Sequence, residues 1–208
     1  MLNSQLLIAF LLTTAVAMVV PGPDMLFVLA SGLRGGPKLA LFATCGVASG
    51  EAVHISLAAG GLSALFLAVP SAFTAVRIAG ALYLLYLGIQ SIRGRSGLGT
   101  RDSASARQQA SRTYLQGMLT NLGNPKMITF TIAFLPQFVD PRLGHIWAQF
   151  LILGAIFLAF EFAVDGSVGI FAGRISGLLE QRKARRGVEI ATGSIFVGLA
   201  ARLAVDRR

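Results

Sequence analysis

The sequence predicts an all-α integral membrane protein with six transmembrane helices, arranged as two inverted repeats of three helices each. Three observations support this fold class. The 208 residues are 54% hydrophobic and 13% charged, and the mean hydropathy is +0.70. Six apolar segments approach the roughly 20 residues that a helix needs to cross a bilayer. A polar linker divides them three and three, and because three is odd the second half enters the membrane inverted.

The predicted helices occupy residues 2–33, 38–66, 71–92, 113–137, 145–172 and 187–205. The first is longer than one span requires, which leaves room for an interruption. It lacks the basic start and cleavage pattern of a secretion signal, so we interpret it as the first membrane helix. The stretch 94–111 is rich in Gly, Ser, Arg and Gln, which is typical of a flexible linker. We therefore expect three-helix repeats at 1–92 and 113–208, joined by a basic cytoplasmic linker at 93–112.

The basic residues predict the orientation. Most of the 18 Lys and Arg lie in the connections between helices one and two, three and four, and five and six. The positive-inside rule places these connections in the cytoplasm and both termini outside. Arg202, Arg207 and Arg208 near the C-terminus argue against this orientation. We interpret the net charge of +9 as a topology signal and predict no nucleic-acid partner.

The first of two breaks in apolar segments is Pro21-Gly22-Pro23-Asp24. Proline removes a backbone donor and glycine tolerates unusual dihedral angles, so the helix should unwind here. Unwound carbonyls can meet a cation, and the restarting half-helix presents free amides to an anion. Asp24 lies at the restart, where it either binds substrate or caps the second half-helix. The alternative, a loop at the membrane surface, is disfavoured by the apolar run from Met25 to Ala30.

The second break is Asn124-Pro125-Lys126, within the predicted fourth helix. A charge inside the membrane costs at least about 2.5 to 3.5 kcal/mol, so it normally faces the protein interior and has a partner. We expect Lys126 and Asn124 to anchor a carboxylate, or Lys126 to move with a transport cycle. The structural alternatives are snorkelling of Lys126 or an ion pair with Asp24 or Glu161.

The middle helix of each half carries acidic residues. Glu51 and His54 are three residues apart and Glu161 and Asp165 are four apart, so each pair shares a helix face. Intramembrane carboxyl groups and histidines are typical of proton relays. The alternative for each is a purely structural role. The candidate proton-coupling residues are Asp24, Glu51, His54, Glu161 and Asp165.

The sequence contains no recognised catalytic or nucleotide-binding motif. There is no nucleophile elbow, zinc-protease motif, phosphate loop or dinucleotide fingerprint, so we predict no enzyme, no ATP-driven pump and no cofactor. Cys45 has no disulfide or zinc spacing, and the scattered Asp24, Glu51 and His54 are a poor metal signature. Glycines spaced by four predict close helix packing, with a homodimer interface as the alternative: Gly46 and Gly50, and Gly169, Gly173 and Gly177.

The ordered motifs resemble a known family. In order they are Pro21-Gly22-Pro23, Gly46 and Gly50, Gly80 to Leu84 with Leu87-Gly88, Asn124-Pro125-Lys126, Phe134 to Phe138, and Gly193. Over essentially the whole chain they look like the lysine exporter (LysE) and threonine/homoserine efflux (RhtB) family. The resemblance implies a multi-pass exporter of amino acids or their derivatives in the bacterial cytoplasmic (inner) membrane, driven by the proton gradient. Both break motifs match motifs of the family by position, whereas Glu161 and Asp165 are inferred from the sequence and not carried over from the resemblance.

Together these features predict proton-coupled export of amino acids by alternating access. We expect the substrate ammonium near Asp24 and Glu51 and its carboxylate near Lys126, Asn124 and half-helix amides. Alternatives are a divalent metal cation transporter using Asp24, Glu51 and Asp165, a membrane enzyme or electron-transfer partner, and a structural subunit. The first break carries the acidic Asp24 and the second the basic Lys126, which favours a zwitterionic substrate over a metal cation. The expected substrate-binding residues are Pro21, Gly22, Pro23, Asp24, Glu51, Asn124, Pro125 and Lys126.

Overall fold

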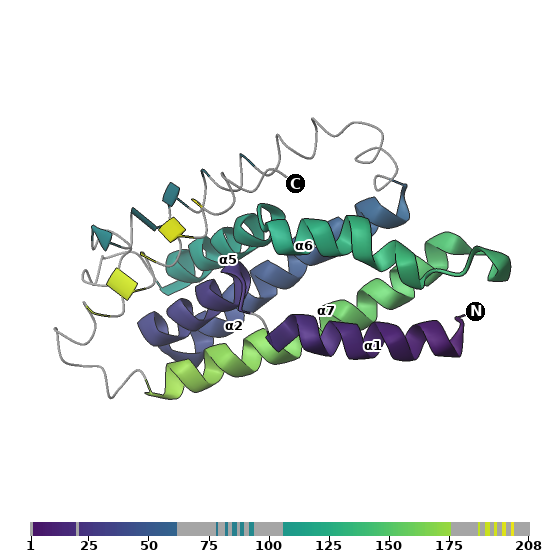
Figure 1. Ribbon diagram of the computed structural model, residues 1–208. Helices are drawn as coiled ribbons and strands as arrows, with labels where there is room; N and C mark the ends of the chain where they lie inside the picture. Colours follow the sequence, from purple (N-terminus) through teal and green to yellow (C-terminus); the bar gives the residue numbers. More distant parts are fainter. Residues whose placement is uncertain are drawn as a thin grey trace.

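The computed structural model describes residues 2–19, 21–61 and 106–175, and scattered positions between 78 and 93 and between 187 and 201. These residues form helices and no strand, so the all-α prediction is confirmed for them. Most of the predicted third and sixth helices and most of the linker lie outside them. The long helices pack along one another in a bundle (Figure 1). The α-helices are α1 (Ser4–Val19), α2 (Pro23–Ala59), α5 (Ala106–Leu122), the short α6 (Pro125–Thr129) and α7 (Ile146–Ile175).

Three short helices connect α6 to α7. They are the π-helix η1 (Phe130–Phe134) and the 3₁₀ helices η2 (Leu135–Phe138) and η3 (Pro141–Leu143). The predicted fourth helix, 113–137, is therefore a broken helix made of α5, α6, η1 and η2. Helix α5 begins at Ala106, earlier than the predicted residue 113 and inside the segment assigned to the flexible linker. Its first residues, ARQQA, have high helix propensity, which explains the longer helix.

Helix α2 is a hairpin of two arms. Gly36 has φ 74° and ψ −172°, a conformation confined in practice to glycine. Val28 and Ala40 would lie about 18 Å apart along a straight helix. Yet a Cβ built on Gly169 would lie 2.6 Å from Val28 Cγ1 and 2.8 Å from Ala40 Cβ. The chain therefore reverses at Gly35-Gly36, between the predicted first and second helices, and arms 23–34 and 37–59 run in opposite directions.

The two broken helices also run antiparallel and meet at their breaks. One consists of α1, the break at Pro21-Gly22 and the first arm of α2; the other runs from α5 through the break at Gly123-Asn124 into α6, η1 and η2. At one end Asn3 donates a hydrogen bond to Asp140. At the breaks, a Cβ on Gly22 would lie 3.3 Å from Lys126 Cδ. From the first contact to the second, residue numbers rise from 3 to 22 in one broken helix and fall from 140 to 126 in the other, so the two run in opposite directions.

Glycines allow α2 to approach α5 and α7 closely. A Cβ on Gly46 would overlap the Tyr114 carbonyl of α5, and one on Gly32 would overlap the Gly169 carbonyl of α7. A Cβ on Gly173 would lie 2.5 Å from the Pro37 nitrogen. Such close backbone contacts are typical of helix packing in membranes. The predicted glycine rows are thus packing seams within the chain, although Gly177 lies outside the described residues.

An aromatic cluster packs α1, η1, η2 and α7 against one another. Phe130 of η1 stacks on Phe157 of α7 with ring centroids 4.1 Å apart, and Phe10 of α1 meets Phe138 of η2 edge-on at 5.3 Å. The cluster lies toward the end where Asn3 bonds Asp140 and where Gln149 bonds the backbone of Asp140. Ring stacking and hydrogen bonds therefore hold α1, η1, η2 and α7 together in this part of the bundle.

The outer surface suits a lipid environment. Ile8, Leu12 and Val16 of α1, spaced by four, expose between 59% and 70% of their surface. Two described helices, Pro23–Ala59 and Ile146–Arg174, are long and apolar enough to cross a membrane, and the hairpin divides the first into its two arms. A continuous apolar stripe is costly in water but favourable against lipid. These features agree with an integral membrane protein.

We predict that Gly46→Ala lowers the unfolding midpoint of the purified protein in detergent, because the added methyl group overlaps the Tyr114 carbonyl and must push α2 from α5. Overpacking of this kind costs about 1 to 3 kcal/mol. Gly166→Ala is the matched control, since its Cβ would meet only Thr44 Cγ2 at an ordinary 3.7 Å. Equal midpoints for the two variants would contradict the seam.

Candidate functional site: a buried carboxylate cluster at the two helix breaks

The interior polar site forms where the two breaks meet. Gly22 is the N-cap of α2, which starts at Pro23, and Asn124 is the N-cap of α6, which starts at Pro125. Proline suits the first position of a helix, where its missing N–H would have no partner. A Cβ on Gly22 would lie 3.3 Å from Cδ and 3.9 Å from Nζ of Lys126. The two break motifs are therefore neighbours in space.

Asp24 connects the two breaks. Its side chain is 2% exposed, and its Oδ2 accepts hydrogen bonds from the side-chain amides of Asn121, at 3.1 Å, and Asn124. No side chain caps α2, so the capping role considered for Asp24 is not what this carboxylate does. Its Oδ1 has no hydrogen-bond partner among the described residues. One oxygen is thus fixed and the other remains a free acceptor.

The amide of Asn124 serves both broken helices. Its Oδ1 accepts a hydrogen bond from the Lys126 backbone N–H at 3.0 Å and so caps α6, while its Nδ2 donates to Asp24. We had expected this amide to contact a substrate carboxylate, but in this conformation it is engaged within the protein. Asn121 was missed in the sequence. Its position could have indicated a role, because Asn121 lies three residues, about one helical turn, before Asn124.

Glu51 enters the site from the second arm of α2. It is fully buried, its Oε1 accepts a hydrogen bond from the Thr131 hydroxyl of η1 at 3.2 Å, and its Oε2 has no partner in the described chain. Thr131 was also missed, because a lone threonine gives no signal in an apolar helix. His54 lies one turn further along and is half-buried, with Nε2 3.3 Å from the Asn121 carbonyl oxygen. It therefore faces α5.

Helix α7 adds two carboxyl groups, Glu161 and Asp165. Both are buried, at 2% and 3% exposed, and both lie within electrostatic range of Lys126 and Asp24. Glu161 is also within range of Glu51. The four predicted acidic residues therefore gather in one interior site from three separate segments. We call Asp24, Glu51, Glu161 and Asp165 the carboxylate cluster.

The carboxylate cluster has more acceptors than donors. Among the described residues of this site, the unpartnered buried acceptors are Asp24 Oδ1, Glu51 Oε2, Asn121 Oδ1 and both oxygens of Glu161. Buried acceptors without donors are costly, so the site favours protons or a ligand rich in N–H or O–H groups. An ammonium group, with three donors, has the required chemistry. No three His, Cys, Asp or Glu side chains of the described segments are grouped to hold a metal ion.

Comparisons with known proteins agree with a membrane location. A family model described as LysE type translocator matches residues 15–207. An uncharacterized membrane protein of Pseudomonas aeruginosa is 34% identical over 201 residues, which cover 94% of this chain and 93% of the relative. A homoserine/homoserine lactone efflux protein of Salmonella typhimurium is 32% identical over 199 residues, which cover 96% of each chain. No solved structure matches.

Substitutions of Asn124 should separate its two contacts. Serine can still cap α6 but is too short to reach Asp24, whereas alanine loses both hydrogen bonds. We expect unfolding midpoints to fall in the order wild type, Asn124→Ser, Asn124→Ala, with about 1 kcal/mol between the two variants, the usual value of an N-cap. Thermal unfolding in detergent measures this order. Equal midpoints for the serine and alanine variants would argue against the cap.

Proposed function

Because the chain belongs to the LysE type translocator family, we propose that it exports amino acids or their derivatives across the bacterial cytoplasmic (inner) membrane. Membership of this family indicates a transporter rather than an enzyme. The name of the Salmonella typhimurium relative, a homoserine/homoserine lactone efflux protein, supports the substrate class. The observation that carries the proposal is the carboxylate cluster beside Lys126, since acidic and basic groups meet in one buried site.

The proposed substrate is a zwitterion held by both signs of charge. Its ammonium donates to the unpartnered oxygens of Asp24 and Glu51. Its carboxylate lies at Lys126, next to the open backbone of Gly22. Asn124 holds one oxygen of Asp24 in place and can turn its amide to the substrate when the ammonium takes over that oxygen. Pro21, Pro23 and Pro125 contribute by keeping both helices broken here.

We propose transport by alternating access between two inverted three-helix repeats, residues 1–92 and 113–208. The antiparallel course of the two broken helices, with their breaks in contact, supports this architecture. In this proposal the aromatic cluster closes the end of the bundle near the N-terminus, which the positive-inside rule places outside. Substrate therefore enters from the cytoplasmic side, and rocking of the halves parts the rings to release it.

Protons are the proposed driving ions. Both oxygens of Glu161 are buried without a partner, and a bound proton relieves the cost of burying a charge there. A proton taken up from outside by the cluster weakens its hold on the substrate ammonium and releases it, and loss of that proton inside resets the cycle. Asp165 stands one turn from Glu161 beside Lys126, and His54 lies at the margin of the site.

We predict that Asp24→Asn and Lys126→Ala each lower amino acid efflux from loaded proteoliposomes at least about tenfold. Removing one member of a buried, hydrogen-bonded charge pair costs about 2 to 5 kcal/mol in binding, which is tenfold or more. Ser167→Ala is the control, because this exposed hydroxyl bonds only the carbonyl of Ala163. Efflux at the wild-type rate by well-folded Asp24→Asn and Lys126→Ala proteins would falsify the assignment of the site.

Glu161→Gln tests the proton step separately. Glutamine keeps the size of the side chain but cannot exchange a proton. We expect an inwardly directed proton gradient to accelerate efflux by the wild-type protein and not by the variant, whereas exchange of labelled for unlabelled substrate at equal pH persists in both. Radiolabel efflux at several external pH values measures this. If the gradient accelerates the variant as strongly as the wild type, another group carries the proton.

A further inference from the structure

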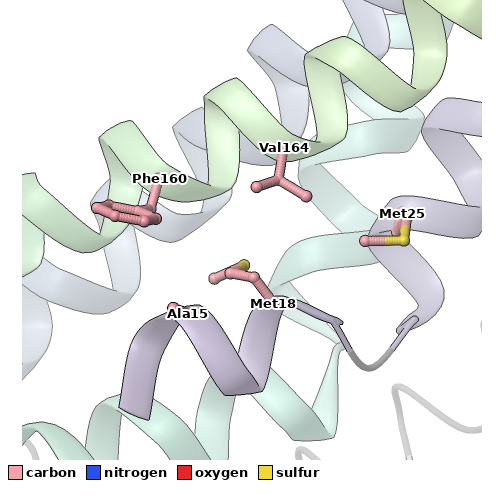
Figure 2. Close-up of a pocket in the computed structure, with 5 residues that line it drawn as sticks. All are labelled: Ala15, Met18, Met25, Phe160 and Val164. Carbon is pink, nitrogen blue, oxygen red and sulfur yellow. The ribbon is translucent and has the colours of Figure 1, made fainter. Parts of the chain in front are cut away.

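An apolar pocket of about 320 Å³ opens at the break between α1 and α2. Ala15 and Met18 line it from the end of α1, Met25 from the start of α2, and Phe160 and Val164 from α7. Figure 2 shows these five side chains converging on one space from three helix segments. Met18 is buried at the inner side, whereas Ala15 and Phe160 are exposed at the mouth. None of the five side chains carries a nitrogen or oxygen atom.

Residues that line the pocket are sequence neighbours of the carboxylate cluster on two helices. Met25 directly follows Asp24, and Phe160 and Val164 directly precede Glu161 and Asp165. Successive residues of an α-helix project about 100° apart, so pocket and cluster occupy adjacent faces of the same turns. The break that brings Asp24 to its amides therefore also opens the apolar pocket.

We propose that this pocket receives the side chain of the exported amino acid, and that the protein prefers aliphatic and thioether side chains such as those of leucine and methionine. This inference rests on the proposed function. An amino acid carries its ammonium, its carboxylate and its side chain on one carbon atom. A substrate whose charged groups lie at the cluster therefore places its side chain on an adjacent face, where the pocket lies.

The lining explains the preference. A hydroxyl group in the pocket would lose its hydrogen bonds to water and find no partner, whereas each methylene leaves water for apolar surface. The volume stands at the small end of the range of about 300 to 1,000 Å³ for ligand pockets, which suits a single side chain. Two methionines line it, and their flexible thioethers adjust to side chains of different shape.

The test is efflux from proteoliposomes loaded with methionine, leucine, homoserine or serine, by the wild type and by Ala15→Phe. The new ring should fill the pocket from its mouth without touching the cluster. We expect the wild type to export methionine and leucine about tenfold faster than homoserine and serine, the discrimination that a small apolar difference typically gives. Ala15→Phe should abolish this advantage, so that methionine and leucine leave no faster than homoserine. Ala9→Phe, at another exposed alanine of α1, is the matched control.

The outcomes separate this inference from the proposed function. Export of homoserine or serine at least as fast as methionine and leucine overturns the pocket inference and leaves amino acid export intact. An advantage for methionine and leucine that survives in Ala15→Phe also overturns it. A wild-type protein that releases none of the four amino acids overturns the proposed function and this inference with it. An unfolding midpoint in detergent equal to that of Ala9→Phe shows that Ala15→Phe folds.

Discussion

Asp24 joins the two broken helices through one carboxylate oxygen, and the arrangement of the interior depends on this contact. Asn121 and Asn124 donate to that oxygen from either side of the second break, so the first turn of α2 is held against the end of α5. Gly22 leaves the room in which Lys126 lies. Without these amides the carboxylate would be buried unsatisfied, which costs several times what an ordinary hydrogen bond contributes.

The breaks and the acidic residues were predictable because they contrast with their surroundings. Charged residues and Pro-Gly-Pro clusters stand out within apolar segments, so Pro21-Gly22-Pro23, Lys126 and Glu161 predicted an interior site from the sequence alone. The turn at Gly35-Gly36 was anticipated by the basic residues beside it. The sequence predicts the start of this helix at residue 113, whereas α5 begins at Ala106. The residues between are polar, as in a linker, but they also have high helix propensity.

Other parts of the site left little or no trace in the sequence. Asn121 and Thr131 are uncharged polar residues, and only their packing against Asp24 and Glu51 gives them a role. The π-helix η1 arises where the chain leaves α6, and no residue pattern distinguishes it from an α-helix. The apolar pocket is made of methionine, phenylalanine, valine and alanine, which occur throughout a membrane protein. Tertiary placement alone distinguishes those residues.

The contact between Asp24 and its amides also has a consequence for biosynthesis. Its two partners lie 97 and 100 residues later in the chain, so the ribosome completes the first half before either amide exists. An isolated charge at the centre of a membrane helix costs about 2.5 to 3.5 kcal/mol on insertion scales. Before α5 is synthesised, Asp24 therefore lacks both of these amide donors, and the described interior is completed only when the later segment packs against α2.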